Sequence, residues 1–265
     1  MSEQQCQILE MKRAQIVPKP VERNNMPESA MIFAAGLGMR MRPLTETTPK
    51  PMIKVLGKPL IDYKIDKLVE AGVKNLVVNT HHLAEKIQKH LSERSDIEIF
   101  ISHEETRLET GGGVLKALPT LGDKPFLTIN SDIIWIDNQE PLLQRIANFW
   151  DNEKMDLLLT LHPVKTAIGY HGNGDFNLDD NGNLLRITDS SHDYVYSGIM
   201  MIDPKILHEI KNDIDESFFS LSELFRKYYN SESLSNRIFG IVNEGKWLHI
   251  DSVATLKEAE DFLSK

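Results

Sequence analysis

The chain has 265 residues, of which 41% are hydrophobic and 26% are charged, and its formal net charge is -9 at pH 7. This composition is typical of a globular chain that is long enough for one large α/β domain or two small ones. The acidic balance argues against nucleic acid or an anionic membrane as a partner, so any basic site has to be local. The single cysteine, Cys6, excludes an intrachain disulfide and fits a reducing cytoplasm.

Residues 1–28 are polar and lack the continuous apolar core of a signal peptide. We expect them to form a flexible N-terminal extension, with a short helix near Gln7–Arg13. No apolar run in the sequence approaches the roughly 20 residues that span a bilayer. We find no internal repeat and no clear linker, so one domain over residues 29–265 is the simplest interpretation.

The first half of the chain predicts alternating strands and helices. Apolar runs predict strands at 31–35, 75–79, 97–102 and 125–130. Helices are expected between them, at 61–69 before Gly72, at 83–91 and at 112–118. Such strand–helix–strand units favour parallel pairing with right-handed crossovers. The expected fold class is α/β, a Rossmann-like, mixed and mainly parallel sheet that is flanked by helices.

The second half reads differently. We expect a helix at 139–150, a strand at 156–162, a hairpin of 175–178 with 184–187 around the turn at 179–182, and a strand at 194–202. A last helix is expected to turn Val253, Leu256, Ala259, Phe262 and Leu263 inward.

A glycine turn follows the first predicted strand, in the stretch that reads IFAAGLGMRMRPLTETTPKPM at 32–52. Glycine lets backbone amides approach an anion closely, and the nearby Arg40, Arg42 and Lys50 would neutralise a triphosphate. A dinucleotide-binding turn would have its third glycine where Met41 stands, and a P-loop would require Gly-Lys-Ser/Thr. Prolines on both sides restrain Lys50, although a solvated surface lysine is the simpler alternative.

Three further features suggest ligand contacts. Asp132 leaves a buried strand, where it either anchors Mg²⁺ or ends the strand as a turn or helix-capping aspartate. Three glycines at 111–113 open a helix at a cost of about 1 kcal/mol each, so either a flat ligand lies against the backbone or the segment is a loose loop. The alternating stretch 247–251 is expected to put Trp247, His249 and Asp251 on one strand face, where Asp251 is either a second metal ligand or a surface residue.

Six ordered motifs together resemble the sugar-1-phosphate nucleotidylyltransferases over residues 30–265. They read AAGLGMRMRPLT with PKPM (34–52), LETGGGVLKALP (108–119), FLTINSD (126–132), NGDFNL (173–178), YSGIMMID (196–203) and WLHIDSVATLKEAE (247–260). Within the family, the chain most resembles the uridylyltransferases of N-acetylmuramate 1-phosphate, which serve peptidoglycan recycling. The guanylyltransferases of mannose 1-phosphate are near relatives. The resemblance implies the nucleotide-diphospho-sugar transferase fold.

The resemblance also implies roles for individual residues. Ala35, Gly36 and Gly38 would hold the triphosphate, Arg40 would stabilise the departing pyrophosphate, and Lys50 would contact the α-phosphate or the sugar phosphate. The remaining groups are the base and ribose contacts Glu104, Thr110 and Gly111, the sugar contacts Gly174, Asp175, Tyr196 and Gly198, and the Mg²⁺ ligand Asp132.

The sequence departs from the family pattern at the second metal ligand. Family members commonly end in Trp-x-Asp-x-Gly-Thr, and in this chain His249 stands at the aspartate position while Asp251 stands at the glycine position. Either Asp251 reaches the metal, or His249 does so in its place, or the metal depends on Asp132 alone.

The implied reaction joins a nucleoside triphosphate, with UTP favoured, to a sugar 1-phosphate and releases pyrophosphate. Guanylyl transfer to mannose 1-phosphate is the alternative within this class, and a non-catalytic regulatory subunit that binds nucleotide sugars is the alternative outside it. We expect a cytoplasmic monomer or small homo-oligomer without nucleic acid or membrane partners.

Overall fold

The computed structural model describes residues 25–179, 184–185, 192–210, 218–230 and 237–265. Cys6, the helix expected near residues 7–13 and most of the turn expected at 179–182 lie outside these ranges. Among the described residues, no helix is both long enough and apolar enough to cross a bilayer.

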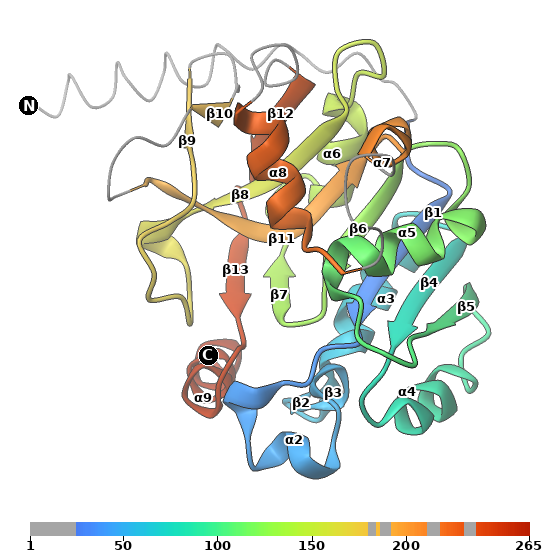
Figure 1. Ribbon diagram of the computed structural model, residues 1–265. Coiled ribbons are helices and arrows are strands. Elements are labelled where there is room, and N and C mark those ends of the chain that lie inside the picture. The colour runs from blue at the N-terminus through green and yellow to red at the C-terminus, as the bar shows by residue number, and fades with distance from the viewer. Residues whose placement is uncertain (1–24, 180–183, 186–191, 211–217, 231–236) are drawn as a thin grey trace, which may run out of the picture.

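A seven-stranded sheet forms the centre of the molecule (Figure 1). In spatial order its strands are β12 (Ile238–Val242), β8 (Leu157–Pro163), β11 (Tyr194–Ile202), β6 (Phe126–Asn130), β1 (Ser29–Ala34), β4 (Asn75–Thr80) and β5 (Glu98–His103). Only β11 runs antiparallel to its neighbours in this sheet, and the other pairs are parallel. The predicted mixed, mainly parallel sheet is therefore confirmed.

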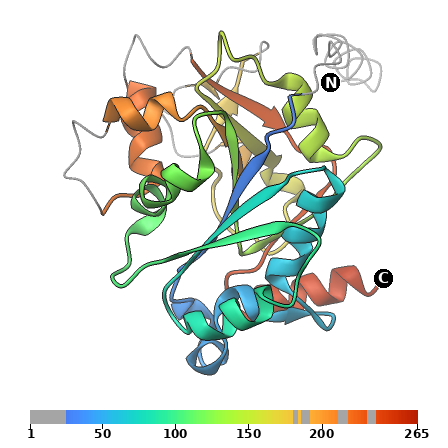
Figure 2. The ribbon, with the colours of Figure 1, turned by 90° about the vertical axis from the view of Figure 1, so that its right-hand side faces the viewer.

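Helices cover both faces of the sheet (Figure 2). One face carries α3 (Leu60–Glu70), α4 (Ala84–Leu91) and α6 (Leu142–Phe149), and the other carries α5 (Glu109–Leu121), α7 (Lys205–Ile210) and α8 (Leu221–Asn230). Successive strand residues point to opposite faces, so Ile32 of β1 packs in the cluster of α3 while Met31 packs in the cluster of α5. A strand buried on both sides reads as a continuous apolar run, which is why β1 was predictable.

Three two-stranded sheets stand apart from the central sheet. The antiparallel pairs are β7 (Ile133–Ile136) with β13 (Lys246–His249), β2 (Lys54–Val55) with β3 (Lys58–Pro59), and β9 (Asn177–Leu178) with β10 (Leu184–Leu185). Short helical turns are η1 (Met39–Met41), α2 (Leu44–Thr47), η2 (Lys50–Met52) and η3 (Val164–Thr166). Helix α9 (Val253–Leu263) starts with a capping box between Ser252 and Thr255 and packs beside the loop that follows β1 (Figure 1).

The predicted elements of the first half occur within a few residues of the expected ranges, as do α6, β8, β11 and α9. The sequence did not predict β2, β3, β7, β12, α7 or α8. β7 and β12 are runs of only four and five mostly apolar residues, and the periodicity of such short runs does not separate strands from other buried segments.

The order of the strands defines a crevice at their carboxyl ends. From β1 the chain passes to β4 and β5 on one side, and α5 then returns it to β6 on the other side of β1. The strand order therefore reverses between β1 and β6, and ligands of open α/β sheets bind outside such a point. The glycine turn after Ala34 and the aspartate after Asn130 both lie there.

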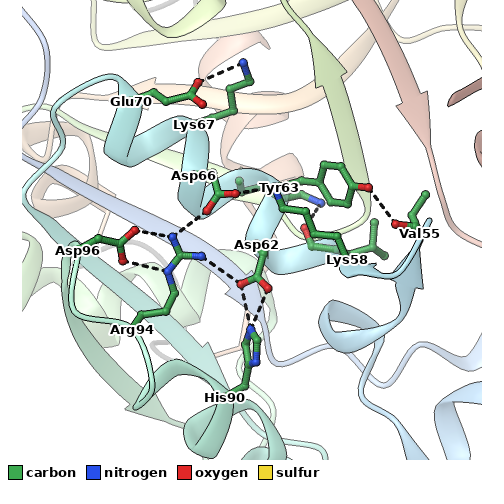
Figure 3. Close-up of polar contacts among 12 residues, drawn as sticks. Val55, Lys58, Asp62, Tyr63, Asp66, Lys67, Glu70, His90, Arg94 and Asp96 are labelled. Carbon is green, nitrogen blue, oxygen red and sulfur yellow. Dashed lines mark hydrogen bonds and ion pairs between the residues drawn. The ribbon is translucent and has the colours of Figure 1, made fainter.

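A network of charged side chains links α3 to the segment that follows α4 (Figure 3). The Arg94 guanidinium lies 2.7 Å from Asp66, 2.7 Å from Asp96 and 3.3 Å from Asp62, whose carboxylate also contacts His90. Burial raises the pKa of Asp66, but hydrogen bonds from Lys58 and Arg94 outweigh this effect and leave the pKa below its usual value.

We predict that Arg94→Met lowers the free energy of unfolding by about 1–2 kcal/mol at pH 7, because three carboxylates lose a common partner. The folded-state pKa of Asp66 is depressed, so this contribution is present above the usual carboxyl pKa and is lost as the pH falls through the lowered value. Urea unfolding at pH 7 and pH 3 measures both effects. As a control, Lys154→Met removes an exposed pair with Asp151 and should cost less than about 0.5 kcal/mol. Equal losses in the two variants would contradict the prediction.

Candidate active site

The glycine turn after β1 is packed on one side and open on the other. Gly38 has a φ of 61°, and a Cβ there would lie 2.8 Å from Thr45 Cγ2. The Thr45 hydroxyl donates a hydrogen bond to the Gly38 carbonyl at 2.9 Å, which fixes the turn against α2. A Cβ at Gly36 would meet no atom within 4 Å, so the space beside Gly36 can receive a ligand.

The two predicted catalytic cations are held by aspartates of distant segments. Lys50 Nζ donates a hydrogen bond to Asp132 Oδ2 at 2.8 Å, and its side chain is only 12% exposed. Pro49 and Pro51 flank Lys50 at the start of η2, as the sequence indicated. Arg40 Nη1 lies 2.5 Å from Asp251 Oδ2, while 70% of the Arg40 side chain remains exposed. Arg40 therefore presents guanidinium surface to solvent, and Lys50 is a restrained, largely enclosed cation.

Asp132 is the central acidic residue of the site. Its backbone carbonyl accepts a hydrogen bond from Ile250 N at 2.8 Å, so the ends of β6 and β13 meet there. Burial alone would raise the pKa of Asp132, but the charge and hydrogen bond of Lys50, together with the nearby His249 imidazole, outweigh it and hold the pKa well below the usual range. The carboxylate is thus ionised at any physiological pH and can bind a cation.

The structure separates the two alternatives for the second metal ligand. His249 is the last residue of β13, its Nε2 lies 3.8 Å from Asp132 Oδ2, and its ring stacks on Trp247. The expectation that Asp251 shares this strand face is wrong, because the strand ends at His249. Asp251 instead pairs with Arg40 and accepts a hydrogen bond from the Thr255 hydroxyl. Of the two candidates, only His249 lines the cavity of Asp132.

Two adjoining cavities contain the residues predicted for the sugar side. A cavity of about 160 Å³ is lined by Asp132, His249, Tyr170, Trp247 and Gly198, among others. A larger, mostly apolar cavity of about 490 Å³ has Thr110, Gly174, Leu159, Met200 and Phe225 in its lining. Asn130, Asp175 and Tyr196 line both, so the two spaces are contiguous. Ala35, Gly36, Gly38, Arg40 and Lys50 line neither of the two.

The glycine run at the start of α5 packs against the protein itself. A Cβ at Gly111 would clash with the ring of Phe219, whose carbonyl accepts hydrogen bonds from the amides of Gly111 (2.9 Å) and Gly112 (3.2 Å). The Thr110 hydroxyl oxygen accepts a hydrogen bond from Leu221 N. The run is thus neither a loose loop nor a bare ligand platform, since a flat group from the chain itself explains the close approach.

Glu104 belongs to a buried polar network beneath this helix. Its two oxygens accept hydrogen bonds from Asn79 Nδ2 (2.7 Å) and Leu108 N (3.0 Å), and only 1% of the residue is exposed. Asn79 Oδ1 in turn accepts from Ala34 N at the end of β1. A Cβ at Gly113 would lie 3.0 Å from this Asn79–Glu104 pair, which explains a second glycine of the run. The predicted base contacts of Glu104, Thr110 and Gly111 stay predictions.

Sequence reasoning missed two residues close to the site. Tyr170 lines the small cavity, and its hydroxyl accepts a hydrogen bond from Gly174 N at 3.2 Å; no pattern in the sequence marked it. Lys64 is fully buried in α3, where its Nζ donates to the Leu60 carbonyl at 2.8 Å. Lys64 falls within the apolar stripe of Ile61, Ile65 and Leu68, so a charged residue on a core-facing position was a readable signal.

The arrangement fits a divalent cation only in part. Within the described residues, no group of three or more His, Cys, Asp or Glu side chains could hold a metal ion. Asp132 and His249 offer two ligand atoms in one cavity, and Mg²⁺ commonly takes one or two protein ligands together with substrate phosphates. The residues therefore fit an ion that the substrates help to bind.

Relatives of known activity match most of the chain. N-acetylmuramate alpha-1-phosphate uridylyltransferase from Caulobacter vibrioides is 37% identical over 90% of this chain and 98% of that protein. The enzyme of the same name from Neisseria meningitidis serogroup B is 32% identical, with 87% and 96% covered. The catalytic subunit beta of mannose-1-phosphate guanylyltransferase from Drosophila pseudoobscura pseudoobscura is 28% identical over 69% of this chain but only 50% of its own length.

The structure also resembles that of a putative glucose-1-phosphate thymidylyltransferase from Bacillus anthracis, with a TM-score of 0.74, 17% identity, and coverage of 88% of this chain and 94% of the other. This likeness confirms the expected nucleotide-diphospho-sugar transferase fold. The relatives that match most of the chain define its class, an enzyme that transfers nucleotidyl groups to sugar phosphates. The model of the nucleotidyl transferase family matches residues 29–265, and the chain belongs to this family as a sugar-1-phosphate nucleotidylyltransferase. Members of the family generally use divalent metal ions.

The buried lysine generates a pH-dependent prediction. Burial, aided by the charges of Lys50 and Lys58 and opposed by Asp132, lowers the pKa of Lys64 to about 7. An ordinary lysine has a pKa of about 10.4, so between pH 7 and pH 10 this residue binds more protons in the unfolded chain than in the folded chain. The destabilisation that Lys64 causes is therefore fully present below about pH 7 and decreases as the pH rises. We predict that Lys64→Met is more stable than the wild type at pH 6.5, and that this gain shrinks by pH 9.5.

Urea unfolding of both proteins over that range provides the measurement. The exposed Lys54 supplies the matched control, because Lys54→Met should show no such pH-dependent difference. A gain in Lys64→Met that stays constant from pH 6.5 to 9.5 would refute the lowered pKa.

Proposed function

We propose that the protein joins UTP to N-acetylmuramate 1-phosphate and releases UDP-N-acetylmuramate and pyrophosphate. The observation that carries the proposal is the Lys50–Asp132 pair at the carboxyl ends of β1 and β6, with Arg40 presented nearby. Two uridylyltransferases of this name resemble nearly the whole chain, which favours this substrate pair over mannose 1-phosphate and GTP. Such an activity would serve the recycling of peptidoglycan.

The reaction requires no nucleophile from the protein. A phosphate oxygen of the sugar phosphate, already anionic at neutral pH, attacks the α-phosphorus of UTP in line, and the bond to the bridging oxygen of pyrophosphate breaks. The main obstacle is the repulsion between two anions. At an effective dielectric constant of about 20, two unit charges about 4 Å apart repel by roughly 4 kcal/mol, so the enzyme has to supply several positive charges and align the reactants.

The turn after β1 and the segment around Lys50 supply these positive charges. The amides around Ala35, Gly36 and Gly38 bind the triphosphate on the open side of the turn, where the space beside Gly36 is free. The exposed Arg40 guanidinium stabilises the charge that develops on the departing pyrophosphate. Lys50, restrained between two prolines, contacts the α-phosphate or the incoming sugar phosphate.

Asp132 would hold a divalent cation, for which the family resemblance implies Mg²⁺, together with His249 or Asp251. When bound, this ion supplies positive charge to the phosphate oxygens. Because Lys50 also contacts Asp132, the carboxylate fixes the position of both cationic groups relative to the end of β6.

The sugar occupies the part of the two contiguous cavities that Gly174, Asp175, Tyr196 and Gly198 line. Asp175 accepts a hydrogen bond from Tyr196 N at 2.9 Å, and both residues line both cavities. With Gly174 and Gly198 they form the sugar side of the site, while Glu104, Thr110 and Gly111 lie on the side of the base and ribose. We assign the activity to a single domain of residues 29–265 in the cytoplasm, as a monomer or small homo-oligomer.

The substrate assignment predicts which pair of compounds gives pyrophosphate. We expect release with UTP plus N-acetylmuramate 1-phosphate to exceed release with GTP plus mannose 1-phosphate, measured with a coupled phosphate assay at equal protein and metal concentrations. Faster release with the second pair would identify a guanylyltransferase. Tight nucleotide binding without release for any pair would instead identify a non-catalytic regulatory protein.

The two cations predict different kinetic losses. Arg40→Ala should lower kcat by about 100-fold or more, with little change in KM for the sugar phosphate, because its charge acts on the leaving group. Lys50→Ala should affect both parameters, because Lys50 contacts a reacting phosphate. Lys54→Ala, which removes an exposed lysine nearby in sequence, serves as the control and should retain both values. Equal losses in kcat and in sugar-phosphate binding for Arg40→Ala would count against its role.

A further inference from the structure

His249 and Asp132 form a pair of unlike metal ligands. Nε2 of His249 lies 3.8 Å from Oδ2 of Asp132, and both residues line the cavity of about 160 Å³. We propose that these two atoms form a mixed imidazole–carboxylate site that binds a first-row transition-metal ion, such as Mn²⁺, in preference to Mg²⁺. The inference rests on the proposed function only in that the ion would serve nucleotidyl transfer.

The chemistry of the ligands carries this preference. Mg²⁺ is a hard ion that binds oxygen almost exclusively, whereas imidazole nitrogen is a good ligand for transition-metal ions. In a site with many protein ligands one nitrogen changes little. The described residues offer no cluster of three or more His, Cys, Asp or Glu side chains that could hold a metal ion. One nitrogen among only two protein ligands therefore has a large effect on which metal ion the site prefers.

The geometry suits a shared ion. Two atoms that ligate one ion at about 2.1–2.2 Å are roughly 3 to 4.3 Å apart, depending on the angle between them. The observed 3.8 Å falls within this interval. The two side chains therefore need little movement relative to each other to bind one ion between them, and the partner that the ion would displace is Lys50 Nζ, 2.8 Å from the same oxygen.

The environment of His249 also limits its freedom to turn away. Its ring stacks on the Trp247 ring, with centroids 5.6 Å apart and an interplanar angle of 6°. The Tyr170 ring is tilted relative to the imidazole, and the centroids of these two rings are 6.1 Å apart. The backbone amide of His249 donates a hydrogen bond to the Ile168 carbonyl at 2.8 Å. These contacts hold the imidazole with Nε2 toward Asp132.

Asp251, the oxygen ligand that could replace His249, is engaged elsewhere. Its carboxylate pairs with Arg40 at 2.5 Å and accepts a hydrogen bond from Thr255 Oγ1 at 3.2 Å. To reach the metal it would have to release both partners. A site with two carboxylates is therefore less accessible in this chain than a site with one carboxylate and one imidazole.

The test uses Mn²⁺ as probe and the full-length, metal-free protein. Electron paramagnetic resonance of free Mn²⁺ during titration gives the affinity, and competition with Mg²⁺ gives the preference. Pulsed measurements of bound Mn²⁺ detect ¹⁴N coupling from a ligating imidazole. The variants are His249→Asp, which replaces the nitrogen ligand by oxygen, and His249→Ala. His171→Ala is the matched control, because His171 is an exposed histidine that pairs with Glu258.

We expect ¹⁴N coupling in the wild type and in His171→Ala, and its loss in both His249 variants. The Mn²⁺ to Mg²⁺ affinity ratio should fall by about tenfold or more in His249→Asp. No Mn²⁺ binding, bound Mn²⁺ without ¹⁴N coupling in the wild type, or coupling that persists in His249→Ala would overturn the proposal. A wild type that binds Mn²⁺ through nitrogen but releases no pyrophosphate with any substrate pair would refute the proposed function and leave this site intact.

Discussion

An ionised carboxylate at the end of β6 is the constraint around which the site is built. Asp132 is largely enclosed, and burial would favour its neutral form if no cation were near. The ammonium group of Lys50, 2.8 Å away, keeps the carboxylate ionised, and the prolines on both sides restrain the backbone of Lys50. Because Lys50 follows β1 and Asp132 follows β6, the ion pair also joins the two strands between which the strand order reverses. The same contact thus compensates the enclosed charge of Asp132 and connects the segments that follow these two strands.

A second pair, Arg40 with Asp251, extends this arrangement to the C-terminal part of the chain. Ile250 donates its amide to the carbonyl of Asp132, so the two acidic segments are adjacent through the backbone. The site therefore contains cations from the turn after β1 and acidic or imidazole groups from the ends of β6 and β13. Under the proposed function, a phosphate-bearing substrate would take the place of some of these carboxylate partners of Arg40 and Lys50.

Residues whose environment is set locally were predictable from the sequence. Lys50 between two prolines and Asp132 at a strand exit are of this kind, and so are the buried strands of the first half. Gly111 was different, because the atom it accommodates comes from Phe219, more than a hundred residues later, and no local pattern announces that partner. The predicted position of Asp251 on the strand face was wrong for a third reason. The alternation of residue types continues past His249, but the strand ends there. Lys64 could have been found from its place on the apolar face of α3.

Arg40 and its partner Asp251 are far apart in the sequence, separated by 211 positions. During synthesis the turn emerges from the ribosome long before β13 and α9 exist. At about 5–20 residues per second, the nascent chain would wait on the order of ten seconds or more for these elements. Until then Arg40 lacks its carboxylate and the apolar residues beside η1 lack α9. Acquisition of a complete site is consequently a late event in the synthesis of the chain.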